Sequence, residues 1–394
     1  MTNFILRRLI GSGFSAYLVG GCVRDTLLKR PVTDWDIATS ANPEEVERLF
    51  DKTVKTGERF GTITVIHDGV PVEVTTYRRD GIYRDNRHPE SVAFGASLDE
   101  DLQRRDLTIN AMAMTESGEI IDPIGGLRDL EFGVIRAVGD PETRFAEDAL
   151  RMFRAFRFKA QLGFTIERGT RQAILKHTHT AGAISPERIA AELTKTLMSD
   201  NPGVVWEVVD AGLLAGYVPK WRTKSDAPFP QTHVASEEPI NGRPIATPTD
   251  VLSTLPQSHN LRWGVFCVLL GDATIAQKLR LPAKTQKIGF AAVQIAQAGF
   301  PQTRAGIKCL LAIHPPDAVK SAAAVGGTSQ SVDEILQSGE CYKIEHLAIS
   351  GRDLLDAGIP EGPELGKALQ KLLEHVIDHP EENEKAKLLR MLNG

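Results

Sequence analysis

The sequence has few cysteines, no long apolar run and no excess of positive charge. Its four cysteines stand singly and far apart, at Cys22, Cys267, Cys309 and Cys341. This spacing lacks the close pairs of a zinc site and the density of a secreted disulfide scaffold. We therefore expect reduced thiols and a cytoplasmic protein.

The longest apolar run, GVFCVLL at 264–270, is far shorter than a membrane-spanning helix, and MTNFILRRLI at the start has no signal-peptide core. Lysine and arginine number 46 against 51 aspartate and glutamate residues, a net charge of -5. This balance excludes a protein that covers nucleic acid with a basic surface all round, but it allows a local basic groove. We expect a soluble protein of 394 residues, 42% of them hydrophobic, without a membrane partner.

Secondary-structure signals change along the chain. Short β-branched runs alternate with helical segments up to residue 122, and Asp68-Gly69 predicts a hairpin turn. From about residue 145 onward, apolar residues recur every three or four positions, which predicts helices. The expected fold class is α+β, with a small mixed sheet and helices followed by an all-helical remainder. The expected strands are Ser15–Val19, Asp34–Ala38, Thr62–His67 and Val70–Tyr77, and the expected helices are Cys22–Lys29 and Glu44–Phe50.

The first motif is YLVGGCVRD at 17–25, where a predicted strand ends in two glycines and a helix begins at once. Glycine lets the backbone approach a ligand closely, and the free N–H groups of a first helical turn attract an anion. Gly21 and Arg24 are therefore candidates for phosphate contacts. An ordinary tight turn between a strand and a helix is the alternative.

Two carboxylates follow in TDWDI at 33–37. In a strand, Asp34 and Asp36 share one face, while Trp35 and Ile37 face the core. Such a pair is able to share two divalent metal ions about 3.5–4 Å apart, as nucleotidyl transfer requires, although most Asp-x-Asp pairs are solvated carboxylates. Glu73, between two valines, is a third carboxylate by pattern alone and is equally consistent with a surface position.

The segment DLQRRDLTIN at 101–110 places two cations and an acid before an apolar stretch. Arg105 is suited to a triphosphate, and Asp106 to a ribose hydroxyl. A solvated cluster of ion pairs is the alternative.

The segment FAEDALRMFRAFRFKA at 145–160 is predicted to be one helix, in which Asp148, Arg151 and Arg154 follow at three-residue steps. Cytosine and adenine both present an amino donor beside a ring-nitrogen acceptor, so a neighbouring carboxylate and guanidinium read either base. Uracil and guanine would leave both groups mispaired, at roughly 1–3 kcal/mol per group. Arg157 lies on the far side and is expected to bind a triphosphate or an RNA phosphate. A surface salt bridge is the alternative for the Asp–Arg pair.

In this order and spacing, LVGGCVRD, DWD, RRDLTINA and EDALRMFRAFRF resemble the bacterial-type (class II) tRNA nucleotidyltransferases and their sister poly(A) polymerases, within the polymerase-beta-like nucleotidyltransferases. The motifs cover 17–160, and weaker similarity continues toward the C-terminus. The resemblance implies addition of C, C and A to the 3′ end of tRNA from CTP and ATP, with Mg²⁺ as cofactor. No protein partner is inferred.

The resemblance also implies roles and domains. Asp34 and Asp36 match the metal-binding catalytic acids. The nucleotide-binding positions match Gly21, Arg24, Arg105, Asp148, Arg151, Arg154 and Arg157. The implied parts are a catalytic head at 1–138, a helical neck at 139–198, a helical body at 199–290 that includes an irregular connection at 219–250, and a helical, tRNA-binding tail at 291–394.

Two further sequence features bear on the activity. Residues 144–195 hold about ten Lys/Arg and five Asp/Glu residues, which predicts a basic groove for RNA unless these charges form a solvated surface. The long polar segment 78–103 favours CCA addition over CC addition, since it is expected to reshape the pocket for ATP. A-adding enzymes and poly(A) polymerases of the same family remain the alternatives, and an inactive RNA-binding homologue is disfavoured because no motif residue is lost.

Overall fold

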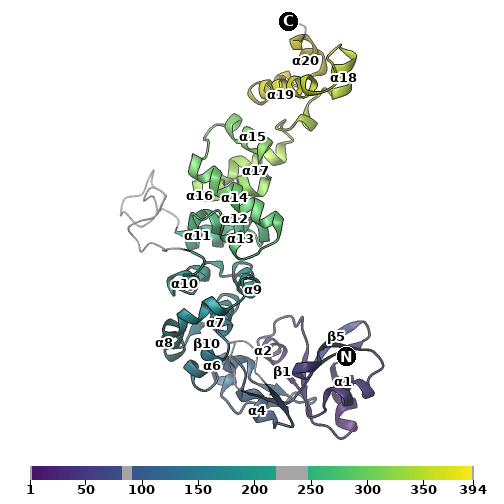
Figure 1. Ribbon diagram of the computed structural model, residues 1–394, viewed down its shortest axis with the longest axis vertical. Coiled ribbons are helices and arrows are strands. Elements are labelled where there is room, and N and C mark those ends of the chain that lie inside the picture. The colour runs from purple at the N-terminus through teal and green to yellow at the C-terminus, as the bar shows by residue number, and fades with distance from the viewer. Residues whose placement is uncertain (1, 82–90, 219–246, 393–394) are drawn as a thin grey trace. The chain divides into compact units, whose positions relative to one another are not determined.

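The computed structural model describes residues 2–81, 91–218 and 247–392. The chain forms two compact units, Met1–Gly216 and Tyr217–Gly394. Strands are confined to the first unit, and the described part of the second is helical (Figure 1). The expected α+β class is confirmed. No helix within the described ranges is long and apolar enough to cross a membrane. The four predicted domains and their boundaries stay predictions.

A seven-stranded sheet organises the first unit, in the order β3-β4-β5-β2-β1-β8-β9. Its strands are β1 (Ala16–Val19), β2 (Asp36–Thr39), β3 (Thr53–Gly57), β4 (Thr62–His67), β5 (Val70–Thr76), β8 (Ala113–Met114) and β9 (Ile120–Ile121). Among the described strands of this sheet, β2 and β5 are the parallel neighbours, with Asp36 beside Glu73, and the other pairs are antiparallel. The predicted hairpin is confirmed, since β4 and β5 pair from Thr62↔Thr75 to His67↔Val70.

Five helices accompany this sheet: α1 (Thr2–Gly11), α2 (Gly21–Leu27), α3 (Pro43–Leu49), α4 (Leu98–Gln103) and α5 (Gly126–Glu131). Local sequence fixes two of their starts, because Asn42 with Glu45 and Ser97 with Glu100 form reciprocal caps on α3 and α4. A separate hairpin, β6 (Arg78–Asp80) and β7 (Val92–Phe94), precedes α4. The predicted strands and helices are found within about two residues of their expected ends.

The rest of the first unit is mainly helical. It comprises α6 (Pro141–Glu147), α7 (Leu150–Leu162), α8 (Arg168–His177), α9 (Pro186–Leu197) and α10 (Val205–Asp210), with the parallel pair β10 (Val134–Ile135) and β11 (Thr165–Ile166). Phe153 and Phe156 of α7 are fully buried, as the apolar stripe predicts. The prediction of one helix over 145–160 is wrong, because Asp148 adopts extended backbone angles (φ -142°, ψ 104°) between α6 and α7.

The second unit contains α11 (Pro248–Thr254), α12 (His259–Leu270), α13 (Ile275–Lys278), α14 (Ala283–Ala298), α15 (Arg304–Ile313), α16 (Pro316–Gly326), α17 (Ser329–Ser338), α18 (Gly351–Asp356), α19 (Pro363–Asp378) and α20 (Lys385–Leu392). The single-turn 3-10 helices are η1 (Glu58–Phe60), η2 (Thr108–Asn110), η4 (Pro202–Val204), η5 (Ile344–His346) and η6 (Pro380–Glu382), and η3 spans Thr178–Ala183. Trp263 and Phe266 of α12 are buried with ring centroids 5.6 Å apart. Leu354, Leu373 and Val376 belong to a second core made by α18 to α20. Most of the predicted connection 219–250 lies outside the described residues.

Candidate active site

The site begins at the turn between β1 and α2. Gly20 has a φ of +76°, which side-chain-bearing residues rarely adopt. A Cβ atom there would lie 3.1 Å from Nη1 of Arg105 and 3.4 Å from Oδ2 of Asp36. Glycine at this position therefore lets a cation from the RRD segment and an acid from β2 meet over the start of α2. Gly21, the predicted contact, lies next in the chain.

Asp36 stands at the start of β2, and Asp34 lies exposed just before the strand. Burial raises the pKa of Asp36 to about 6, and the negative charges of Glu73 and Asp34 add to the rise while Arg105 opposes it. Carboxylates whose charges repel one another favour a bound cation, and carboxylate oxygens are the ligands that hard divalent ions prefer. The donor set therefore fits a divalent metal.

Glu73 lies in register with Asp36, but its side chain is exposed. Within the described ranges, no group of three or more His, Cys, Asp or Glu side chains has the geometry to hold a metal ion. Asp34 and Asp36 therefore stay the predicted metal ligands, with Glu73 as a nearby charge.

Arg24 projects from α2 into a buried polar setting. Its guanidinium pairs with Asp25 at 2.7 Å and donates to Oδ1 of Asn110 at 2.6 Å. The guanidinium carbon also lies 4.7 Å from the ring centre of Phe158 on α7. Arg24 is therefore fixed between the turn, the RRD segment and α7.

Two carboxylates organise the RRD segment, the buried Asp101 and the partly buried Asp106. Asp101 on α4 pairs with Arg104 at 2.7 Å and with Arg105 at 3.1 Å. Asp106 accepts a hydrogen bond from Nε of Arg154 at 2.6 Å. Burial on its own would raise the pKa of Asp106, but Arg154 and further donors outweigh that effect and hold the pKa well below its usual range. Asp106 is therefore ionised and joined to α7.

The predicted side-chain pair of Asp148 and Arg151 is not formed. Asp148 accepts from the backbone N–H of Leu150 at 3.0 Å and pairs with Arg188 of α9 at 2.8 Å. Arg151 pairs with Glu147 at 2.7 Å. The physical reason is the break between α6 and α7: the three-residue spacing places residues on one strip only where the helix is continuous.

Arg157 is buried against another charge. It lies 3.0 Å from Glu192 of α9, and both side chains are less than a tenth exposed. Burial lowers its pKa to about 10, and the positive charge of Arg154 adds to that effect. The guanidinium carbons of Arg154 and Arg157 lie 5.5 and 4.2 Å from the centre of the Phe158 ring, so with Arg24 three cations surround one aromatic ring.

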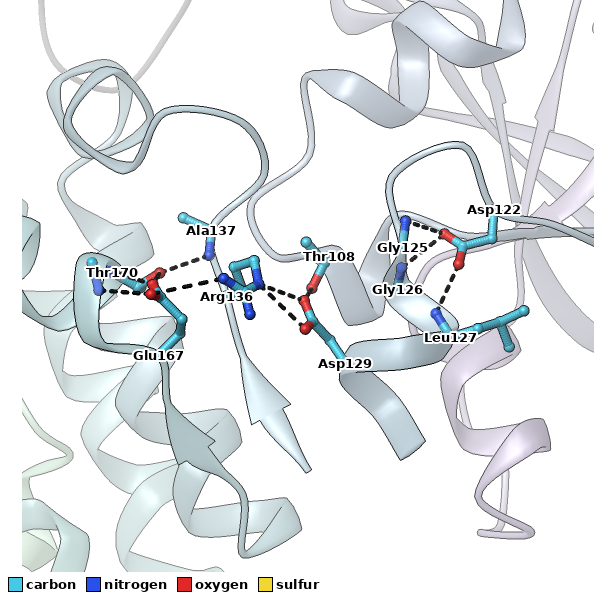
Figure 2. A network of polar contacts seen from close by, with 11 residues as sticks. Thr108, Asp122, Gly125, Gly126, Leu127, Asp129, Arg136, Ala137, Glu167 and Thr170 are labelled. Carbon is cyan, nitrogen blue, oxygen red and sulfur yellow. Dashed lines mark hydrogen bonds and ion pairs between the residues drawn. The ribbon is translucent and has the colours of Figure 1, made fainter. Parts of the chain in front are cut away.

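Figure 2 shows a network of polar contacts that includes Thr108 of the RRD segment. Arg136 donates to Asp129 of α5 at 3.0 Å and lies 3.7 Å from Glu167. Asp129 also accepts from the hydroxyl of Thr108 at 2.6 Å. Glu167 in turn accepts from the backbone N–H groups at the start of α8, so that this network joins the RRD segment to the following helices.

Most of the basic residues in 144–195 are neutralised by carboxylates. Eight of the ten form ion pairs, among them Lys159 with Glu207 and Lys176 with Glu142. The local positive charge is therefore smaller than the residue count predicted. The core of the predicted switching segment 78–103, residues 82–90, lies outside the described residues.

Sequence reasoning missed the partners that orient the predicted residues. They are Gly20, Asp25, Asp101, Asn110, Phe158, Arg188 and Glu192. A local signal existed for the break beside Asp148, because aspartate within a helical pattern often caps a new helix start. The partners of Arg154 and Arg157 lie 48 and 35 residues away, beyond the reach of local spacing.

Three family profiles match the chain. The Poly A polymerase head domain matches residues 16–136, the RNA and SrmB-binding site of polymerase A matches 163–223, and tRNA nucleotidyltransferase domain 2 matches 304–392. The CCA-adding enzyme of Pediococcus pentosaceus is 37% identical over 99% of this chain and 96% of its own. That of Anoxybacillus flavithermus is 38% identical over 98% and 94%.

Solved structures agree with these relatives. The CCA-adding enzyme of Bacillus stearothermophilus, solved in complex with CTP, is 32% identical with a TM-score of 0.77, covering 99% of this chain and 95% of that one. The Thermotoga maritima enzyme complexed with tRNA has a TM-score of 0.69 at 21% identity, which supports the fold alone. This chain therefore belongs to the CCA-adding enzymes, a family of tRNA nucleotidyltransferases.

Proposed function

We propose that this protein adds C, C and A in turn to the 3′ end of tRNA, using CTP and ATP and releasing pyrophosphate. The observation that carries the proposal is the full-length match to CCA-adding enzymes, one of them solved with CTP. Hydrogen bonds between the motifs, such as those of Arg24 with Asn110 and of Arg154 with Asp106, also support the proposal. We place the reaction in the cytoplasm, with which the four free cysteines are consistent.

Asp34 and Asp36 would hold the divalent metal, which we propose is Mg²⁺. The chemistry it would supply there is a lower pKa for the attacking hydroxyl and charge neutralisation of the departing pyrophosphate. Arg105 lies beside Asp36 and supplies a permanent positive charge where the triphosphate has to sit. Gly21 contributes a backbone N–H at the start of α2.

A second group of cations at the triphosphate site, besides Arg105, lies around the ring of Phe158 and consists of Arg24, Arg154 and Arg157. The carboxylates paired with Arg24 and Arg154 hold these guanidinium groups in place before the nucleotide binds. A site assembled in advance saves the cost of ordering these side chains when the nucleotide binds.

Base choice falls to Asp148 and Arg151. A carboxylate accepts from the amino group that cytosine and adenine share, and a guanidinium donates to the neighbouring ring nitrogen. Arg188 holds Asp148 at 2.8 Å, and Glu147 holds Arg151 at 2.7 Å, so both groups are positioned by partners outside the base. Uracil and guanine leave both groups mispaired.

The test is a time course with both nucleotides on a tRNA that ends at the position before CCA, read by sequencing the 3′ ends. The proposal predicts C, CC and CCA in succession, with growth stopping at CCA. A-adding activity would leave this tRNA unextended, and poly(A) synthesis would extend it with a run of adenosines. The second unit, whose described C-terminal part matches tRNA nucleotidyltransferase domain 2, is proposed to bind the tRNA.

A further inference from the structure

Asp101 is a buried charge next to the proposed nucleotide site and is not among the residues proposed to contact the nucleotide or the metal. It lies on α4 with 1% of its surface exposed. Its Oδ1 accepts from Nε and Nη2 of Arg104 at 3.0 and 2.7 Å, and its Oδ2 accepts from Nη2 of Arg105 at 3.1 Å. Burial on its own would raise the pKa of this carboxyl, but the two arginines reverse the effect and lower it.

The two terminal nitrogen atoms of the Arg105 guanidinium have different surroundings. While Nη2 is bound by Asp101, Nη1 lies beside the backbone at Gly20, where Oδ2 of Asp36 is also found. In the part of the chain that the structure describes, Asp101 is the carboxylate that forms an ion pair with Arg105. The Nε atom of Arg105 is buried and has no hydrogen-bond partner there. The direction of this guanidinium therefore depends on Asp101.

We propose that Asp101 is a positioning residue that aims the guanidinium of Arg105 at the triphosphate of the incoming nucleotide. The inference rests on the proposed function, in which Arg105 contacts that triphosphate. An arginine side chain has many rotamers, and a fixed carboxylate restricts it to the productive one before the nucleotide binds. Without the charge of Asp101, Asp36 becomes the carboxylate that Arg105 faces, and the cation is drawn toward the metal site.

The variant Asp101→Asn tests the proposal because it keeps the shape and removes the charge. Its amide presents N–H donors to the N–H donors of Arg104 or Arg105, so at least one contact is lost. The measurement is the equilibrium Kd of CTP, ATP and inorganic tripolyphosphate without tRNA, for the full chain. Asp129→Asn is the matched control, since Asp129 is also buried and accepts from an arginine, Arg136, but is not bonded to Arg105 (Figure 2).

Asp101→Asn is expected to weaken all three ligands by the same factor, about tenfold. Asp129→Asn is expected to lower the unfolding temperature while leaving the three Kd values within about twofold. Weaker binding of CTP and ATP without weaker binding of tripolyphosphate would overturn the proposal, because the effect would then lie at the base or the ribose.

A double-mutant cycle with Arg105→Ala separates the positioning role of Asp101 from the proposed contact between Arg105 and the triphosphate. If Asp101 acts through Arg105, adding Asp101→Asn to Arg105→Ala causes no further loss of tripolyphosphate binding. Losses that multiply would overturn the positioning role and leave the proposed function standing. Arg105→Ala that binds tripolyphosphate as the parent does would instead contradict the placement of Arg105 in the proposed function.

Discussion

The carboxylate of Asp148 pairs with the guanidinium of Arg188 at 2.8 Å, which ties the break between α6 and α7 to helix α9. Its second oxygen accepts from the N–H of Leu150. Each carboxylate oxygen has two lone pairs, so both contacts leave acceptor capacity for an amino group of a base. Asp148 is thus held in place and still able to read a nucleotide.

Replacing Asp148 is expected to relax base choice. In Asp148→Ala the group that favours an amino donor is gone. In Asp148→Asn the side-chain amide is able to rotate, so that its N–H donates to the carbonyl of uracil or guanine. Both variants are expected to incorporate UTP and GTP at a rate closer to that of CTP and ATP, with the ratio changing by about tenfold or more. The check is competition among all four nucleotides. An unchanged ratio at a lower rate would show that Asp148 supports structure only.

Replacing either metal-binding acid is expected to stop the chemistry and spare tRNA binding. Asp34→Ala and Asp36→Ala remove metal ligands, whereas tRNA affinity comes mainly from phosphate contacts elsewhere. The measurements are nucleotide incorporation at saturating Mg²⁺ and tRNA binding by filter retention. Glu73→Gln is the control and is expected to retain turnover, because the side chain of Glu73 is exposed. Retained turnover in both aspartate variants contradicts the assignment.

Gly20→Ala is expected to lose activity beyond its effect on stability. The new methyl group would lie 3.1 Å from Nη1 of Arg105, which therefore has to shift by a few tenths of an ångström, and 3.4 Å from Oδ2 of Asp36. Gly69→Ala is a matched control, because Gly69 also has a positive φ, of +79°, but a methyl group there meets nothing within 4 Å. Backbone strain costs each variant on the order of 1–3 kcal/mol. Equal activity of the two variants at equal folded fraction would refute the crowding argument.

The second unit carries a pH-dependent contribution to stability. Glu340 pairs with Lys308 at 2.8 Å, and Lys308 is 2% exposed. Hydrogen bonds from Arg304 lower the pKa of Glu340 to about 2. Burial of the carboxyl opposes this shift, and Lys308 adds to it. The ionised form therefore stabilises the fold above the unfolded pKa near 4.5, and this contribution is lost as pH falls toward 2.

Glu340→Gln is expected to lower the free energy of unfolding by about 2 kcal/mol at pH 7, since it leaves a buried ammonium group without its charged partner. The difference from the parent protein is expected to shrink between pH 4.5 and pH 2 in urea-unfolding curves. Glu334→Gln, which breaks an exposed pair with Arg304 at 3.4 Å, is the control and is expected to have little effect. A difference that is constant with pH would contradict the linkage.

Local sequence patterns predicted the strands of the sheet well, but they did not predict which residues pair with the site residues in the folded chain. Alternating β-branched residues and the Asp68-Gly69 turn located β4 and β5, because a hairpin is a local structure. The parallel register of Asp36 with Glu73 joins segments 37 residues apart, and no spacing rule predicts it.

The same limit explains the error at Asp148. Helical periodicity in 145–160 was correct for the buried phenylalanines, but the aspartate side chain bonds to a local N–H and competes with the helix. Asp101 was within a recognised motif, yet its role depends on burial and on two arginines, which only the folded chain reveals.

The most direct test of the central claim is the ladder of products from a tRNA that lacks its 3′ CCA, supplied with CTP alone, ATP alone or both. A CCA-adding enzyme is predicted to add two cytidines with CTP alone and to form no CCA end with ATP alone. When both nucleotides are present, it is predicted to complete CCA with a single adenosine. Extension only of a tRNA that already ends in CC, or a long adenosine tail, would contradict the account.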